Sequence, residues 1–235
     1  MFTNLSRATL PQQIVKTLLD YIANQNLQPG DILPSENTLA ANFGVSRPVV
    51  REALKSLAGQ GVVQIINGKG AVIRAVDDES LRRFFQRAVQ LDQTTIVELM
   101  EIRKPLEVQS AFLAAQRRTP EESAQILATA AAMQEALHDL DLYADLDVRF
   151  HLQIVAATHN TMLVYLISSI REALKNTIQE GLRRMDTAEQ LTGMQLTHQE
   201  IATAIDQGDT NAAGQLMTTH FDGAVMKLIK ATATD

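Results

Sequence analysis

The sequence predicts a mainly α-helical protein of two domains, at residues 1–76 and 77–235. Apolar residues recur every three or four positions over most of the chain, which is the helical period. One strong hairpin signal, Asn67-Gly68, stands near the end of the first domain. Residues 1–76 hold seven Lys and Arg and four Asp and Glu, a net charge of +3. The remaining residues hold fourteen Lys and Arg and twenty-three Asp and Glu, a net charge of −9, which gives −6 for the whole chain. A basic module therefore precedes an acidic helical body.

The composition limits the class of protein. Hydrophobic residues make up 46% of the chain and charged residues 20%, which is enough apolar surface for packed cores. The absence of cysteine excludes disulfides and thiolate metal sites. The N-terminal stretch MFTNLSRATLPQQ lacks the apolar segment of a signal peptide, and no apolar run reaches the ~20 residues that span a bilayer. We expect a cytoplasmic protein without membrane contact.

Three helices are predicted before the hairpin. The first spans residues 10–24, with Thr9 as its N-cap. The second begins after Ser35, whose side-chain oxygen can accept an unpaired backbone N–H, and ends at Gly44, which suits a left-handed C-terminal residue. The third begins after Ser46, a second predicted N-cap, with a proline in the first turn where the missing N–H costs little.

The third helix has two distinct faces. The inward face is apolar and consists of Val50, Leu54 and Leu57. The outward face is basic and consists of Arg47, Arg51 and Lys55. After Gly61, residues 62–66 read as a strand that turns at Asn67-Gly68, with Lys69 at the tip. Two helices around a short turn, followed by a hairpin, make a winged helix-turn-helix, in which the second helix enters the DNA major groove.

The run PGDILPSENTLAANFGVSRPVVREALKSLAGQGVV resembles the DNA-binding domain of GntR-family bacterial transcription regulators. It contains their LPSE entry, their valine-serine-arginine turn and their arginine-glutamate-alanine-leucine recognition helix. Several members have arginine after LPSE, where this chain has Asn37, so a contact there is missing or changed. A basic helix face alone is usually only solvated, and the assignment depends on the hairpin and the resemblance as well. The predicted DNA-binding residues are Ser35, Asn37, Ser46, Arg47, Pro48, Val49, Arg51, Asn67, Gly68 and Lys69.

The second domain is predicted to be a bundle of six or seven helices between Ser80 and Lys230. The polar, acidic stretch from Ala75 to Glu79 is the expected linker. Pro105 falls inside an otherwise helical run and is predicted to kink it.

Four polar residues interrupt the apolar seams of this bundle. Asp147 and His151 share the face of their helix that carries Phe150, at a spacing of four. His198 and His220 each break an apolar seam on the last two predicted helices. A divalent cation, zinc or else nickel or another transition metal, would satisfy one carboxylate and three imidazoles buried together. The alternative is that the histidines are ordinary core residues with hydrogen-bond partners.

These positions also resemble the FCD ligand-sensing domain of the FadR subfamily. The resemblance implies that Asp147, His151, His198 and His220 hold a metal, and it includes Asn160 a little further along the chain. The earlier EIRKPLE resembles the subfamily's arginine-x-x-leucine-glutamate element. It implies that Arg103 binds an effector carboxylate, and Asn160 is grouped with it as effector-binding. The alternative for Arg103 is an ion pair within its own helix, with Glu107.

We therefore expect a homodimeric, ligand-responsive transcription regulator rather than an enzyme. It would bind double-stranded operator DNA, sense a small carboxylate at its metal, and repress a carbohydrate-acid or organic-acid catabolic operon. Two alternatives remain open at this stage. A metal-dependent hydrolase would use an open coordination position to activate water, and a direct metal sensor would respond to the ion itself.

Overall fold

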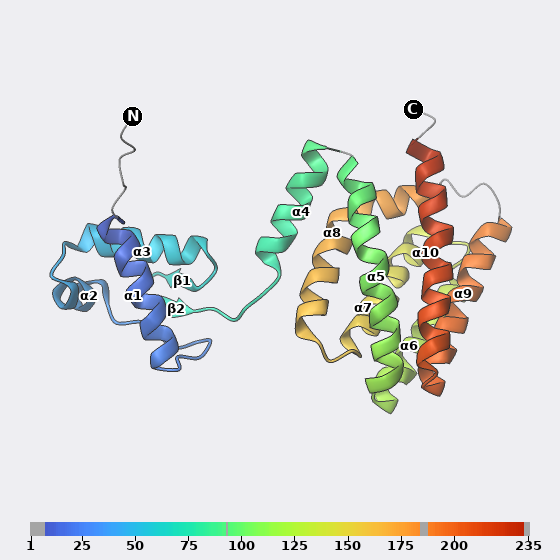
Figure 1. The fold of residues 1–235 in the computed structure, drawn as a ribbon, viewed down its shortest axis with the longest axis horizontal. Coiled ribbons are helices and arrows are strands. Elements are labelled where there is room, and N and C mark those ends of the chain that lie inside the picture. Colours follow the sequence, from blue (N-terminus) through green and yellow to red (C-terminus); the bar gives the residue numbers. More distant parts are fainter. Residues whose placement is uncertain (1–7, 93, 184–187, 233–235) are drawn as a thin grey trace, which may run out of the picture. The chain divides into compact units, whose positions relative to one another are not determined.

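The computed structural model describes residues 8–92, 94–183 and 188–232, with the backbone alone at 178–183, 188 and 224–232. The chain divides into two compact units, Met1–Asp77 and Asp78–Asp235. Figure 1 shows the two units, one of helices with a hairpin and one of helices alone. The predicted fold class, a winged helix-turn-helix followed by a helical bundle, is confirmed.

The first unit contains three helices and a hairpin: α1 (Leu10–Asn24), α2 (Glu36–Phe43), α3 (Arg47–Gly59), β1 (Val63–Ile66) and β2 (Gly70–Ile73). The predicted capping holds at two ends: Thr9 forms a capping box with Gln12, and Ser35 Oγ accepts from the Thr38 N–H at 3.1 Å. Gly44 ends α2 with φ 64°, in the left-handed region that glycine adopts without strain. The prediction for Ser46 is wrong in one respect, because it stands at the N-cap of α3 but its side chain makes no capping hydrogen bond.

The hairpin is antiparallel and pairs Ile66 with Gly70 at its tip. Its loop therefore has three residues, 67–69, closed by the Lys69 N–H donating to Ile66 O at 3.0 Å. Gly68 and Gly70 have positive φ, as a three-residue hairpin turn requires. The unit's core joins all three helices to the hairpin through Leu18, Leu39, Leu54, Leu57 and Val63, among others.

The second unit has seven helices in its described part: α4 (Glu79–Leu91), α5 (Thr94–Arg117), α6 (Pro120–Glu135), α7 (Leu140–Ala156), α8 (Thr161–Arg183), α9 (Ala188–Gln207) and α10 (Thr210–Thr232). Two elements differ from the sequence reading. The linker is shorter, since Glu79 already belongs to α4, and α5 continues through Pro105. Pro105 is exposed, so water can bind the carbonyl that loses its helical partner.

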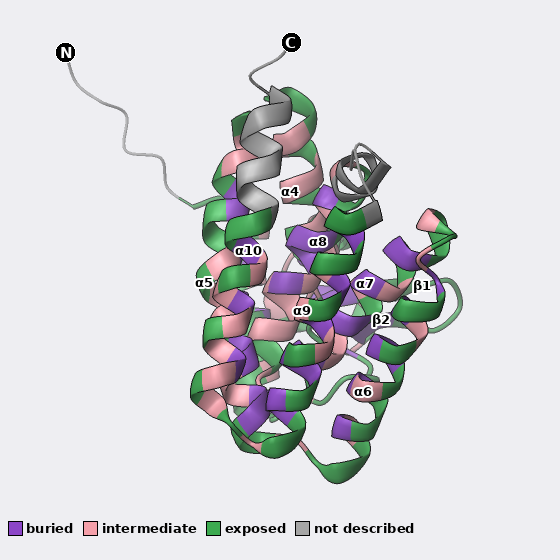
Figure 2. Cartoon of the chain, turned by 90° about the vertical axis from the view of Figure 1, so that its right-hand side faces the viewer, coloured by how far each residue is buried: buried purple, intermediate pink, exposed green. Residues whose placement is uncertain are grey.

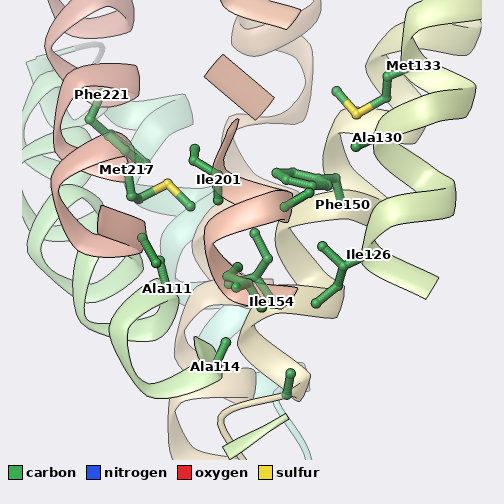
Figure 3. Packing of buried hydrophobic residues seen from close by; sticks show 14 of the residues in the cluster. Ala111, Ala114, Ile126, Ala130, Met133, Phe150, Ile154, Ile201, Met217 and Phe221 are labelled. Atoms are coloured by element: carbon green, nitrogen blue, oxygen red, sulfur yellow. The ribbon is translucent and has the colours of Figure 1, made fainter. Parts of the chain in front are cut away.

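The seven helices share one core. α10 packs on α5 and α9, α6 packs on α7 and α9, and α8 packs on α4 and α7. Figure 2 shows buried residues as stripes on the helices, with exposed residues on the opposite sides. Figure 3 shows part of the core, including Ile126 and Ala130 of α6, Phe150 of α7 and Ile201 of α9. The polar cluster described next lies on the same inward faces.

Candidate metal centre and DNA-reading helix

Three histidines from three helices meet in the bundle. His151 of α7, His198 of α9 and His220 of α10 each bring a ring nitrogen within 4.8 Å of the other two. Their ring centroids lie 4.6 Å apart for His198 and His220, 5.1 Å for His151 and His220, and 5.6 Å for His151 and His198. The seam-breaking positions predicted from the sequence therefore come together in space.

Asp147 stands beside the histidines. Its Oδ1 lies 3.7 Å from His151 Nε2 and 3.4 Å from His198 Nε2, while its Oδ2 lies 3.4 Å from Nη1 of Arg171. Burial opposes ionisation of this carboxyl, but the neighbouring positive charge, that of the Arg171 guanidinium above all, outweighs it and holds its pKa well below the usual range. Asp147 therefore presents a carboxylate to the cluster.

The donor set suits a divalent transition metal. Burial lowers the pKa of all three histidines, that of His198 to about 3, so each imidazole is neutral, as a metal ligand must be. The Nε2 atoms of His151 and His198 and the Nδ1 atom of His220 are buried without a hydrogen-bond partner. Buried polar atoms in folded proteins are normally satisfied, so three unsatisfied lone-pair donors around one point fit a metal ion.

A buried charge network surrounds His151. Glu107 of α5 contacts His151 Nδ1, and it forms an ion pair with Arg103 on its own helix, as the alternative sequence interpretation predicted. Arg171 of α8 binds the same carboxylate through two bonds, Nε to Oε1 at 3.1 Å and Nη2 to Oε2 at 3.2 Å. Burial raises the pKa of Glu107, but Arg103 and Arg171 outweigh this and hold it well below its usual value.

Arg103 has further neighbours. Its Nη1 lies 3.7 Å from Met100 Sδ, its guanidinium carbon lies 5.0 Å from the centre of the Phe221 ring, and only 4% of the residue is exposed. Asn160 has a local role, because its Oδ1 accepts from the N–H groups of Met162 and Leu163 at 3.1 and 3.3 Å and so caps α8. The assignment of Asn160 to an effector stays a prediction.

Sequence reasoning missed Arg171. It is 1% exposed and lies in α8 among Ile167, Ile170 and Leu174, all fully buried. A polar residue in an apolar seam was the signal that indicated the histidines, and the same signal was present here.

At the other end of the chain, the predicted reading residues lie on an exposed helix face. The side chains of Arg47 and Arg51 are 58% and 53% exposed. Both point toward Glu36, the first residue of α2. Arg51 Nε and Nη2 lie 3.1 and 2.8 Å from Glu36 Oε1 and Oε2, and Arg47 Nη2 lies 3.6 Å from Oε2. The hydrogen bond from Arg51 is the main cause that lowers the pKa of Glu36.

The remaining predicted DNA residues are placed as follows. Ser46, Pro48 and the tip residues 67–69 are exposed, and so is Asn37. Val49 is partly buried against the core of the first unit. Ser35 is exposed but its side chain is engaged in capping α2. The ion pair of Glu36 with Arg51 was not predicted, because two partners 15 positions apart leave no periodic signal in the sequence.

Comparison with known proteins identifies this architecture. Residues 10–73 match the family described as bacterial regulatory proteins, gntR family, and residues 98–223 match the FCD domain. The chain belongs to the GntR family of bacterial transcription regulators and carries an FCD domain. The members of this family are DNA-binding transcription regulators and not enzymes, which excludes the hydrolase alternative.

Two relatives of this GntR-family protein cover most of both chains. The "HTH-type transcriptional regulator LutR" of Bacillus subtilis strain 168 is 31% identical over 85% of this chain and 92% of its own. The "Putative L-lactate dehydrogenase operon regulatory protein" of Escherichia coli K12 is 32% identical over 88% of this chain and 80% of its own. Among solved structures, Streptococcus agalactiae GntR superposes with a TM-score of 0.69 at 24% identity, over 92% of this chain and 99% of that one, which shows a shared fold.

Within the part of the chain that the structure describes, no helix is long and apolar enough to cross a bilayer.

Proposed function

We propose that this GntR-family regulator is a homodimeric repressor, acting in the cytoplasm, whose FCD domain senses a small carboxylate beside a divalent metal ion. The observation that carries the proposal is the meeting of three neutral, unpartnered imidazole nitrogens next to the Asp147 carboxylate. Asp147, His151, His198 and His220 would hold the ion, with zinc the first candidate and nickel the next. Once bound, the ion would supply a positive centre that accepts an oxygen ligand.

The charge of the network favours an anionic effector. Arg103 and Arg171 balance Glu107 and Asp147, and the three imidazoles are neutral. A divalent ion therefore adds a net charge of +2 to a buried region, where charges are weakly screened. A carboxylate would offset part of it, and Arg103 is the proposed partner of that carboxylate because a guanidinium can bind it bidentately and stays charged at physiological pH.

The class of acid is suggested by a relative. The name of the E. coli relative concerns an L-lactate dehydrogenase operon. Lactate is a 2-hydroxycarboxylate, which can offer one carboxylate oxygen and its hydroxyl to the same cation. We propose that a 2-hydroxy acid of this size is the effector and that an organic-acid catabolic operon is the target.

The operator is read by the winged helix-turn-helix. Arg47 and Arg51 are proposed to contact base edges or nearby phosphates, while Ser46 and the tip residues 67–69 contact phosphates. Ser35, Asn37, Pro48 and Val49 complete the proposed DNA-facing surface. A symmetric dimer would place two such units on the two halves of a palindrome.

The test is a thermal-shift titration of zinc-loaded protein with L-lactate. Propionate is the matched control, because it lacks only the hydroxyl group. Lactate at 100 times its dissociation constant should stabilise the protein by ~2.7 kcal/mol, and propionate should bind more weakly. A protein that takes up no zinc or nickel, or that responds equally to both acids, would contradict the proposal.

A DNA titration tests the coupling. Lactate should weaken operator binding, and operator DNA should weaken lactate binding by the same factor, because the coupling is reciprocal. Arg103→Ala should still bind operator DNA yet lose its response to lactate. Lys104→Ala, next along the chain and only partly buried, removes a positive charge outside the network and is the control.

A direct metal sensor is the remaining alternative. It predicts that zinc alone changes operator affinity and exchanges readily, whereas a resident ion stays bound through purification.

A further inference from the structure

His198 has two ring nitrogens with different surroundings. Its Nε2 lies 3.4 Å from Asp147 Oδ1 and has no hydrogen-bond partner, while its Nδ1 lies 3.3 Å from the Tyr143 hydroxyl. His198 and Tyr143 are both fully buried. A metal ligand must be a neutral imidazole, and a neutral imidazole carries a single N–H. Only the tautomer with that hydrogen on Nδ1 leaves an Nε2 lone pair for a metal.

A chain of hydrogen bonds selects this tautomer. It starts at the backbone carbonyl of Ala130 in α6, which can only accept. Gln195 Nε2 donates to that carbonyl at 2.7 Å, so the amide oxygen of Gln195 faces the other way, toward Tyr143. The Tyr143 hydroxyl lies 3.2 Å from this oxygen and donates to it, because an amide oxygen cannot donate.

The last link follows from the hydroxyl's single hydrogen. A phenol hydroxyl has one hydrogen to donate and keeps it at neutral pH. With that proton committed to Gln195, the Tyr143 oxygen can only accept from His198. The Nδ1 atom of His198 must therefore carry the hydrogen. At His151, the Glu107 carboxylate contacts Nδ1 only as an ion-pair neighbour, and no hydrogen bond fixes its tautomer in the same way.

We propose that Tyr143 and Gln195 are positioning residues of the metal centre, which fix His198 in the Nδ1–H tautomer and aim its Nε2 lone pair at the ion. This inference rests on the proposed metal site. Hydrogen-bond partners of ligating imidazoles typically change metal affinity by ~10–100-fold when they are removed. Neither residue would touch the ion, and both act through His198.

The first test uses the metal-free parent protein labelled with ¹⁵N-histidine. The ¹⁵N shifts and ring couplings at pH 7 should show His198 with a protonated Nδ1 and an unprotonated Nε2. A hydrogen on Nε2, or an even mixture of the two tautomers, would overturn the proposal without any variant.

The second test compares zinc affinity. Tyr143→Phe keeps the ring and removes the hydroxyl, so it should raise the zinc dissociation constant by ~10–100-fold and shift His198 toward the Nε2–H tautomer. Tyr21→Phe, the same change in the first unit, should do neither. Gln195→Leu should reproduce the tautomer shift while leaving the Tyr143 hydroxyl in place.

The outcomes separate this inference from the proposed function. A parent that binds no zinc refutes the metal site, and with it the positioning role. A parent and a Tyr143→Phe variant that bind zinc equally refute the positioning role alone. A variant that loses stability but keeps the parent tautomer assigns Tyr143 to the core and refutes the inference as well.

Discussion

Arg171 offers the most decisive test of the buried network. It is 1% exposed and makes two bonds to Glu107 and one contact, at 3.4 Å, to Asp147. Replacing it with methionine keeps much of the side-chain volume and removes the charge. Glu107 would still have Arg103, but Asp147 would face only neutral imidazoles.

The expected cost follows from the buried charge that remains. Breaking a buried ion pair by removing one partner costs about 3–5 kcal/mol, mostly because the other charge is left uncompensated. For a domain of this size, 1 kcal/mol moves the midpoint of thermal unfolding by about 2–4 °C, so Arg171→Met should lower it by roughly 6–20 °C.

Thermal and urea unfolding followed by circular dichroism measure this effect. Arg87→Met, at an exposed position on α4, is the control and should change stability by no more than about 0.5 kcal/mol. Zinc should recover part of the loss, because the ion gives Asp147 a new positive partner. If metal-free Arg171→Met unfolds like the control, the electrostatic account of the network is wrong.

Three further predictions concern other parts of the chain. Arg51→Ala should weaken operator binding by ~1–3 kcal/mol. Glu36→Gln should also weaken operator binding but should strengthen binding to random DNA, because it frees the two arginines and removes a negative charge. Fluorescence anisotropy with both DNAs measures the difference, with Glu52→Gln as the control. The pKa of Glu122 is lowered, first by the Thr119 backbone N–H and then by His159. The Glu122 carboxylate therefore stabilises the fold above the unfolded pKa of about 4.3, and this stabilisation is lost as the pH falls through the lower folded pKa. Glu122→Gln should flatten the fall in melting temperature on the acid side of its pH profile. Ser168→Ala should bind lactate and operator DNA normally but show a smaller effect of lactate on operator affinity. If that effect is unchanged, the hydrogen bond between Ser168 and Asp78 does not couple lactate binding to DNA binding.

Much of the fold could be predicted because its signals are local. Thr9, Ser35 and Gly44 act within one turn of their own helix ends, and the structure places caps at all three. The apolar seams of the bundle helices are also local patterns, and they correctly predicted that one histidine from each of α7, α9 and α10 lies on an inward face. Ser46 shows the limit, because its position at the N-cap follows from sequence but its side-chain rotamer does not.

The partners of the site residues could not be predicted in the same way. Periodicity gives the face on which a side chain lies, but not which charge stands opposite it on another helix. Glu36 and Arg51, or Glu107 and Arg171, are brought together only by tertiary packing, across 15 and 64 positions of sequence. For Arg103 the local pair with Glu107 was foreseeable, but the second arginine on the same carboxylate was not.

Helix α8 connects the buried charge network to the end of the linker. Arg171 joins α8 to the carboxylates beside the histidines, and one turn earlier Ser168 Oγ lies 2.8 Å from Asp78 Oδ2. Asp78 is the N-cap of α4 and the first residue after the segment that leaves the DNA-binding unit. The proposed anionic effector, by drawing Arg103 away from Glu107, would leave that carboxylate more dependent on Arg171, and a shift of Arg171 would displace α8. Because Asp78 is hydrogen-bonded to Ser168 on α8, such a shift would move the end of the linker and would give the proposed effector a physical route to the winged helix.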